Sequence, residues 1–358
     1  MRFPEFSGEW KHVHLKEIAE FQKQRISTAL LNNNNYISTE NILQDFEGIQ
    51  CSSSMPANVN VIKYQNEDIL LSNIRPYLKK VWFADRKGGC SADVLVLRGN
   101  KCDKYFLYYV IASDRFINYV MSGIKGVKMP RGDKNQMEEY AFSIPTNMEQ
   151  KRIAKFISIL DERIRLQNKI IEKLQSLIKG IRNNMMIQNQ GDYIALQDIA
   201  DIYQPKTILS TDLTEDGYLV YGANGIIGKY HLYNHEKEQI CITCRGNTCG
   251  TVNYTEPKSW ITGNAMVINT DNFAENVNKR YLFHYLSSIN FNSIISGSGQ
   301  PQIVRQPLAK LKIILPELTI QEHIAKCLDT ILAKIKNEQT SLQAIQIQKS
   351  YLLSQMFI

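Results

Sequence analysis

Between Glu149 and Ile187 the sequence reads EQKRIAKFISILDERIRLQNKIIEKLQSLIKGIRNNMMI. Apolar residues recur here at alternating steps of four and three, the heptad spacing that keeps one seam of a helix against a partner helix. An α-helix rises about 1.5 Å per residue, so a helix over this whole stretch would be too long for the core of one small domain. We therefore predict a long helix whose seam comprises Ile153, Ile157, Leu160, Ile164, Gln167, Ile171 and Leu174.

The same seam recurs 171 residues later, with Glu338 in the position of Gln167 and Lys349 as a further polar break. One apolar stripe is typical of a core helix in an all-α domain, but two copies in register favour a pair of helices. We predict an antiparallel coiled coil in which partner positions sum to 509, with the polar residues fixing its register. The second seam comprises Ile324, Leu328, Ile331, Ile335, Glu338, Leu342 and Ile345.

The internal repeat extends to the segments before each helix. Matching pairs are the short amphipathic segments 15–20 and 196–201, the strand-like runs 67–72 and 238–243, the runs 91–97 and 262–268, the aromatic helices 104–109 and 280–285, and the last strands 140–144 and 311–315. We predict an α+β fold in which two similar mixed α/β globules alternate with two long helices. The expected domains are 1–147, 148–190, 191–318 and 319–358, with a polar linker at 188–192 between the halves.

Composition sets broad limits on the function. The chain has 358 residues, is 44% hydrophobic and 22% charged, and has no apolar run as long as a membrane span. The first ten residues show no signal-peptide core, so we expect a cytoplasmic protein whose seven cysteines are reduced. The net charge of +7 suits a polyanionic partner but does not identify one.

Two motifs suggest chemistry and are better explained by structure. Residues 222–230 approach a phosphate-binding loop, but the spacing is one residue too long and Tyr230 replaces the Ser/Thr that binds magnesium, so we predict a turn between strands. Cys241, Cys244 and Cys249 invite a zinc interpretation, but no second paired motif is present, so buried thiols are the expected outcome. No nucleophile–base pair is evident, and we predict no catalytic or metal site.

Two polar loops, 123–136 and 297–306, carry side chains suited to DNA. Lys and Arg neutralise phosphates, while Arg, Asn and Gln hydrogen-bond guanine and adenine edges. The loops differ between halves while the scaffold matches, as two modules that read different sequences require. The predicted DNA-binding residues are Arg75, Lys79, Lys80, Lys125, Lys128, Arg131, Lys134, Asn135, Gln136, Arg245, Asn247, Ser298, Gln300, Gln302 and Arg305.

Taken together, these features resemble the specificity (S) subunit of a Type I restriction–modification enzyme, over essentially the whole chain. The resemblance is carried by Ile144-Pro145 with residues 149–154 and by Leu315-Pro316 with residues 321–325, together with segments 36–42 and 221–228. The second copy departs from the usual Glu-Gln-Lys-Arg helix start, since it reads Ile320-Gln321-Glu322-His323.

The resemblance implies two target recognition domains that read a split DNA target, separated by spacer helices. The partners that it implies are double-stranded DNA, two methyltransferase (M) subunits and restriction (R) translocase–nuclease subunits. The M subunits would bind S-adenosylmethionine, and the R subunits would use ATP and Mg. It implies no cofactor and no catalysis in this chain. The alternatives are a coiled-coil adaptor without direct DNA binding and the specificity part of a fused restriction enzyme.

Overall fold

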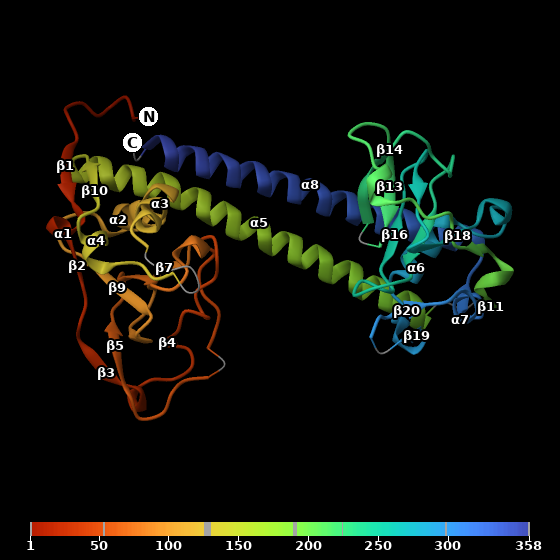
Figure 1. The fold of residues 1–358 in the computed structure, drawn as a ribbon, viewed down its shortest axis with the longest axis horizontal. Coiled ribbons are helices and arrows are strands. Elements are labelled where there is room, and N and C mark those ends of the chain that lie inside the picture. The colour runs from red at the N-terminus through yellow and green to blue at the C-terminus, as the bar shows by residue number, and fades with distance from the viewer. Residues whose placement is uncertain are drawn as a thin grey trace. The chain divides into compact units, whose positions relative to one another are not determined.

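Two units of the chain each combine β-sheets and short helices with part of both long helices (Figure 1). The computed structural model describes residues 2–52, 54–124, 130–188, 192–223, 225–297 and 299–356. Unit 1 comprises Met1–Gln167 and Ser341–Ile358, and unit 2 comprises Asn168–Thr340. Of the linker predicted at 188–192, residues 189–191 lie outside the described residues.

Unit 1 contains ten short strands and four short α-helices among its described residues. The strands are β1 (Lys11–His14), β2 (Ala19–Phe21), β3 (Arg25–Ser27), β4 (Tyr36–Ile37), β5 (Asn60–Tyr64), β6 (Ile69–Ser72), β7 (Val81–Phe83), β8 (Gly88–Cys90), β9 (Val94–Gly99) and β10 (Ala141–Ile144). The helices are α1 (Leu15–Ile18), α2 (Lys104–Ile111), α3 (Asp114–Ser122) and α4 (Lys134–Glu138). Unit 1 has two four-stranded sheets, β2-β9-β6-β7 and β3-β5-β8-β4, and a separate two-stranded sheet, β1-β10.

Unit 2 repeats most of this order. Its strands are β11 (Asp192–Ala195), β12 (Asp201–Tyr203), β13 (Tyr218–Gly222), β14 (Gly225–Tyr230), β15 (Ile240–Thr243), β16 (Val252–Tyr254), β17 (Trp260–Ile261), β18 (Ala265–Asn269), β19 (Ile295–Ser296), β20 (Gln302–Ile303) and β21 (Lys312–Leu315). Its short helices are α6 (Lys279–Leu286) and α7 (Arg305–Ala309). Sheet β12-β18-β15-β16 repeats β2-β9-β6-β7, and β11-β21 repeats β1-β10, whereas the second sheet, β14-β13-β17, differs.

Sheet β2-β9-β6-β7 of unit 1 is buried on both faces at its strand β6. Ile69 and Leu71 of β6 join the core that also holds α2, α3 and the start of the first long helix, while Leu70 between them joins the core under the second sheet. Alternation along a strand sends successive side chains to opposite faces. In unit 2, Cys241 of β15 occupies the position of Leu70 and packs on Tyr221 and Ile261, which accounts for its burial.

The long helices are α5 (Asn147–Gln188) and α8 (Leu318–Met356), and in each unit their segments run side by side in opposite directions (Figure 1). Every predicted seam residue is buried or half-buried. In unit 1, Ile153 and Met356 share one core, and the amine of Lys349 lies 2.5 Å from a carboxylate oxygen of Asp161. Both contacts agree with the antiparallel register expected from the sequence.

Two expectations need correction. The polar loops end in short helices, so Lys134, Asn135 and Gln136 lie on α4 and Arg305 lies on α7. The expected match between segments 104–109 and 280–285 is wrong by one residue. Asp103 and Asn278 each cap their helix by accepting a backbone N–H three residues on, which aligns Lys104 with Lys279 rather than with Arg280. The turn expected within 222–230 is confirmed as the hairpin β13–β14.

Candidate nucleic-acid interface

In unit 1 the loop after β6 is held against residues 130–132. The N–H of Arg75 donates to the carbonyl of Pro130 at 2.9 Å, and the N–H of Gly132 donates to the carbonyl of Asn73 at 3.0 Å. Between these bonds, Ile74 and Arg131 form an antiparallel bridge. We call residues 73–80 and 130–132 the unit 1 loop pair.

The same three contacts recur in unit 2. The N–H of Gly246 donates to the carbonyl of Pro301 at 3.0 Å, the N–H of Ile303 donates to the carbonyl of Cys244 at 3.0 Å, and Arg245 is bridged to Gln302. Every residue stands 171 positions after its unit 1 counterpart. We call residues 244–250 and 300–303 the unit 2 loop pair. The repeat therefore builds the same two backbone hydrogen bonds and bridge twice, with different side chains. We call this set of backbone contacts the frame.

Backbone conformation within the frame shows a second difference. Gly246 has a φ of 83°, and Arg75 occupies the equivalent position with a φ of 50°. Left-handed backbone is costly for a residue that carries a Cβ, by on the order of 1 kcal/mol, and glycine avoids that cost. Unit 1 therefore keeps an exposed arginine where the frame favours glycine.

The basic residues of the unit 1 loop pair differ in their partners. Lys79 lies 2.7 Å from a carboxylate oxygen of Asp114, and Arg131 lies 3.1 Å from one of Asp93. Arg75 is exposed, and among the described residues its guanidinium has no ion-pair or hydrogen-bond partner. Arg75 is thus the cation of this loop pair that is most available to an external anion.

Two other predicted residues of unit 1 are used within the fold. The Lys80 amine donates to the Thr39 carbonyl at 2.7 Å, and the Gln136 side-chain amide donates to the Tyr119 carbonyl at 2.7 Å. Asn135, on the same short helix as Gln136, is exposed.

In unit 2 the predicted residues stay at the surface. All of those that are described are exposed, namely Arg245, Asn247, Gln300, Gln302 and Arg305. Lys125, Lys128 and Ser298 lie outside the described residues. The structure thus brings Arg245 and Gln302 together on one face, because paired residues of an antiparallel bridge project to the same side.

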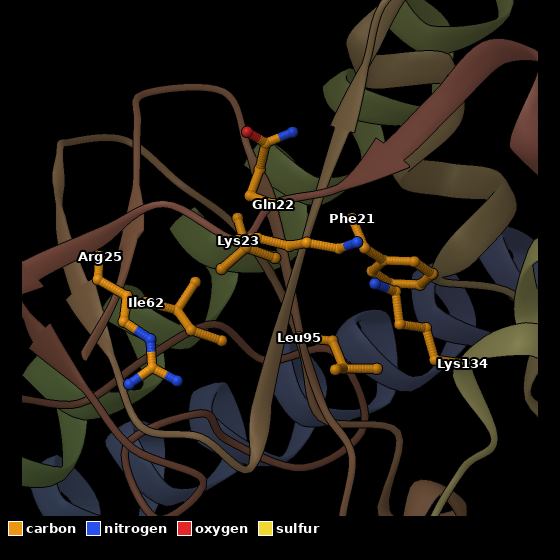
Figure 2. A pocket seen from close by; sticks show the side chains of 8 residues that line it. Phe21, Gln22, Lys23, Arg25, Ile62, Leu95 and Lys134 are labelled. Atoms are coloured by element: carbon orange, nitrogen blue, oxygen red, sulfur yellow. The ribbon is translucent and has the colours of Figure 1, made fainter. Parts of the chain in front are cut away.

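A cleft of about 420 Å³ opens at the start of α4 in unit 1 (Figure 2). Lys134, the first residue of α4, places its amine 5.0 Å from the centre of the Phe21 ring. Figure 2 shows the Lys23 amine directed toward the same ring and Arg25 on the other side, near Ile62. The cleft is lined by Phe21, Gln22, Lys23, Arg25, Ile62, Leu95, Val96 and Lys134.

A polar junction ties the long helices to the short helix α2 in unit 1. Asp161 of α5 accepts a hydrogen bond from the Tyr109 hydroxyl at 2.8 Å and pairs with Lys349 of α8. Burial, reinforced by the nearby Asp161 carboxylate, raises the pKa of Tyr109, so this hydroxyl stays a donor. The polar break at Lys349 in the predicted seam is therefore matched by a carboxylate on the facing helix.

Unit 2 has its own junction around the buried side chain of His284 on α6. Arg182 of α5 donates to His284 Nδ1 at 3.1 Å, and Nε2 lies 2.8 Å from Asp329 of α8. Since arginine can only donate, Nδ1 accepts its hydrogen bond, and Nε2 carries the ring proton and donates a hydrogen bond to the Asp329 carboxylate. Burial lowers the pKa of His284 to about 4, so the ring is neutral near pH 7. Although burial alone would raise the pKa of Asp329, hydrogen bonds from Arg280 and His284 hold it below its usual value.

Comparison with known proteins agrees with this repeated arrangement. The family model for the Type I restriction modification DNA specificity domain matches residues 7–176 and 192–346. The chain belongs to this family. Each of the two matches covers one sheet assembly and most of the long helix that follows it, so the specificity domain occurs twice in one chain.

Several curated specificity subunits are similar to this chain. A putative type I restriction enzyme specificity subunit from Haemophilus influenzae is 29% identical over 45% of the chain and 40% of its own length. The EcoprrI specificity subunit from Escherichia coli is 31% identical over 31% of the chain and 27% of its own length. The MjaVIII specificity subunit from Methanocaldococcus jannaschii is 24% identical over 98% of the chain and 91% of its own length.

Solved structures show the same fold. The S subunit of a Type I restriction–modification system from M. genitalium matches with a TM-score of 0.71 and 17% identity, over 100% of this chain and 99% of that one. A chain from a structural study of complex assembly and conformational transition in a type I R-M system matches with a TM-score of 0.58 and 17% identity, over 98% of both chains.

Among the residues that the structure describes, no group of three or more His, Cys, Asp and Glu side chains is placed to hold a metal ion. Within the same ranges, no helix has both the length and the apolar character to cross a membrane.

The sequence does not predict Lys23 and Arg25 as site residues. They lie more than 100 residues from Lys134, and neither belongs to a recognisable motif.

Proposed function

We propose that this specificity-family chain reads a bipartite double-stranded DNA target without catalysing any reaction itself. Residues 1–147 and 191–318 act as target recognition domains, one for each half-site. The observation that supports this most directly is the loop pair, built on the same hydrogen-bond frame in both units with different side chains. A repeated frame with altered polar groups suits two readers of two different sequences.

Within each frame, the two bridged positions are proposed to read bases. They carry Ile74 and Arg131 in unit 1, and Arg245 and Gln302 in unit 2. Arginine hydrogen-bonds guanine and glutamine hydrogen-bonds adenine, while an apolar side chain contacts the thymine methyl group. The chemistry at the bridge therefore differs between units in the way that a difference in target requires.

An exchange of the bridged residues tests this proposal. Arg245→Ile with Gln302→Arg gives unit 2 the side chains of unit 1, and Ile74→Arg with Arg131→Gln makes the reciprocal change. In cells that carry the complete system, sequencing of methylated bases should show a changed second half-site for the first variant and a changed first half-site for the second. If both variants methylate the original target, the bridged residues do not read DNA.

The long helices are proposed as spacers, with expected limits of 148–190 and 319–358. Two readers can enter major grooves on one side of DNA only if the half-sites lie about one helical turn apart. Removal of one heptad from α5 and of the facing heptad from α8 is expected to change the number of unread base pairs between the half-sites. The same methylation assay measures that gap, and a constant gap contradicts the spacer role.

The partners are proposed to be two methyltransferase subunits that bind S-adenosylmethionine and restriction subunits that use ATP and Mg, together acting in the cytoplasm. The chain alone should then neither methylate nor cut DNA when incubated with S-adenosylmethionine and magnesium. Transfer or cleavage by the purified chain would favour a fused enzyme. A protein-only adaptor predicts no steeply salt-dependent DNA binding, whereas a DNA reader predicts it.

A further inference from the structure

The cleft of unit 1 has a concentration of positive charge that the fold does not neutralise. Three of its eight lining residues are cationic, Lys23, Arg25 and Lys134, and none is acidic. Among the residues that the structure describes, none of the three has an ion-pair partner. The Lys134 amine lies 5.0 Å from the centre of the Phe21 ring, and Lys23 and Arg25 line the same cleft (Figure 2), so a bound anion would relieve the repulsion among these cations.

The shape of the cleft indicates more than a bare anion. Its volume of about 420 Å³ lies within the range of roughly 300–1,000 Å³ that is typical of small-molecule sites. Ile62 and Leu95 supply an apolar wall, and Gln22 supplies a neutral polar group. A ligand with a phosphate and an attached apolar, partly polar body matches this lining.

Unit 2 provides an internal comparison. Its cleft of about 380 Å³ is built beside Arg305, which stands 171 residues after Lys134 at the start of the equivalent short helix. That cleft is lined by one cation and one carboxylate, Asp201, so its charges balance. Each unit thus has a cleft at the start of this short helix, although most of the other lining residues come from different segments, and the excess of positive charge is found in the cleft of unit 1.

We propose that the unit 1 cleft binds a nucleoside phosphate, with the phosphate held by Lys23, Arg25 and Lys134 and the sugar and base against Ile62 and Leu95. The nucleotide belongs either to a DNA strand or to the free nucleotide pool. Position favours the strand, because Lys134 follows the loop pair segment 130–132 by two residues. This inference rests on the proposed DNA-reading function.

The test uses the full chain, alone and assembled with its methyltransferase subunits. The variant Lys23→Ala/Arg25→Ala/Lys134→Ala is compared with Lys101→Ala/Lys237→Ala/Lys310→Ala, which removes the same charge from exposed positions elsewhere. DNA affinity is measured over a salt series, and free dAMP and ATP are titrated by calorimetry. We expect the cleft variant to bind every DNA more weakly, to flatten the slope of log affinity against log salt by roughly 1, as loss of one phosphate contact requires, and to keep the methylated target.

The outcomes separate the two sources of nucleotide. A flatter salt slope without any binding of dAMP or ATP assigns the cleft to a DNA strand, whereas binding of a free nucleotide that only the cleft variant loses assigns it to the pool. An unaltered slope and unaltered titrations, or equal effects in the control variant, overturn the proposal. Failure of the unmodified assembly to bind any bipartite DNA counts against the proposed function instead, and the nucleotide titration still tests the cleft.

Discussion

Gln150 accepts the backbone N–H of Asp103 through its side-chain carbonyl at 2.8 Å. Its amide group donates to the carbonyl of Pro145 at 2.9 Å. Gln321 repeats both contacts in unit 2, with Asn278 at 2.8 Å and Pro316 at 2.7 Å. The glutamine at each long-helix start thus joins three elements: the preceding proline, the cap of the short aromatic helix, and the long helix itself.

Gln150→Leu is expected to lower the free energy of unfolding by roughly 2–4 kcal/mol. Gln150 is only 3% exposed, so the substitution leaves the partly buried Asp103 N–H and the buried Pro145 carbonyl without this partner. Gln321→Leu should have a similar effect on unit 2. Urea unfolding with hydrogen exchange measures both the loss and the unit in which it occurs. Gln175→Leu, on the exposed side of α5, is the matched control and should change stability by less than about 0.5 kcal/mol.

Arg75→Gly is expected to stabilise unit 1 by about 1 kcal/mol while weakening DNA binding. Glycine relieves the left-handed conformation that Arg75 adopts, with a φ of 50°. Arg75→Ala removes the guanidinium but retains the strain, so it should weaken DNA binding without any gain in stability. Thermal unfolding and DNA titration of the two variants separate backbone strain from side-chain contact. Equal stability of the two variants would contradict the strain.

How much of this fold could be read from the sequence depends on the range of the contacts. The seams of α5 and α8 follow from a heptad period within one segment, and residues such as Leu160 and Leu328 are buried as expected. Asp103 and Asn278 predict the correct alignment of the two aromatic helices, because Asp and Asn are preferred at the N-cap. The helix α4 was also signalled, since the side chain of Asp133 accepts backbone N–H groups at its start.

The candidate site was less accessible from sequence. Ile74 pairs with Arg131 through a single isolated bridge between segments that share no periodicity. The sequence of neither segment therefore predicts the contact. The helix α7 includes Pro307, which is tolerated there because it lies in the first helical turn. The cleft joins Lys23 to Lys134 only after two sheets have formed, and no motif spans that separation.

Acidification is expected to destabilise unit 2 through His284. The folded state holds the pKa of His284 near 4, and the unfolded chain returns it to about 6.5. The unfolded state therefore binds the extra proton between these values, so stability falls as the pH drops from 6.5 towards 4, by on the order of 3 kcal/mol in total. Urea unfolding at a series of pH values measures the slope.

His284→Gln should remove most of this dependence of stability on pH. It should also lower the stability at pH 7, because the contact with Asp329 is altered. Asp329, whose pKa is lowered, loses its contribution at still lower pH and leaves a residual acid sensitivity. His323 is exposed on α8, and its replacement by Gln is the control. An equal slope in both variants would show that His284 does not set the pH dependence.

The pair of Lys349 and Asp161 is expected to specify helix register more than stability. Replacing Lys349 by Leu restores an apolar seam and leaves Asp161, whose side chain is 34% exposed, with its Tyr109 hydrogen bond. Because the Asp161 carboxylate that remains is solvated and keeps this hydrogen bond, the unfolding free energy should change by less than about 1 kcal/mol. Asp161→Leu alone should cost roughly 1–3 kcal/mol, since it leaves the Lys349 charge and the Tyr109 hydroxyl without that partner.

Register itself is measured by cysteine cross-linking between α5 and α8 in chains that carry Gln167→Leu and Glu338→Leu together with Lys349→Leu. With every polar seam residue replaced, several alignments bury equal apolar area, and we expect cross-links at registers other than a sum near 509. Restoring Lys349 in that background should narrow the products to the single register in which its amine reaches Asp161. If the fully apolar seam keeps one register, loop connections rather than polar seam residues align the helices.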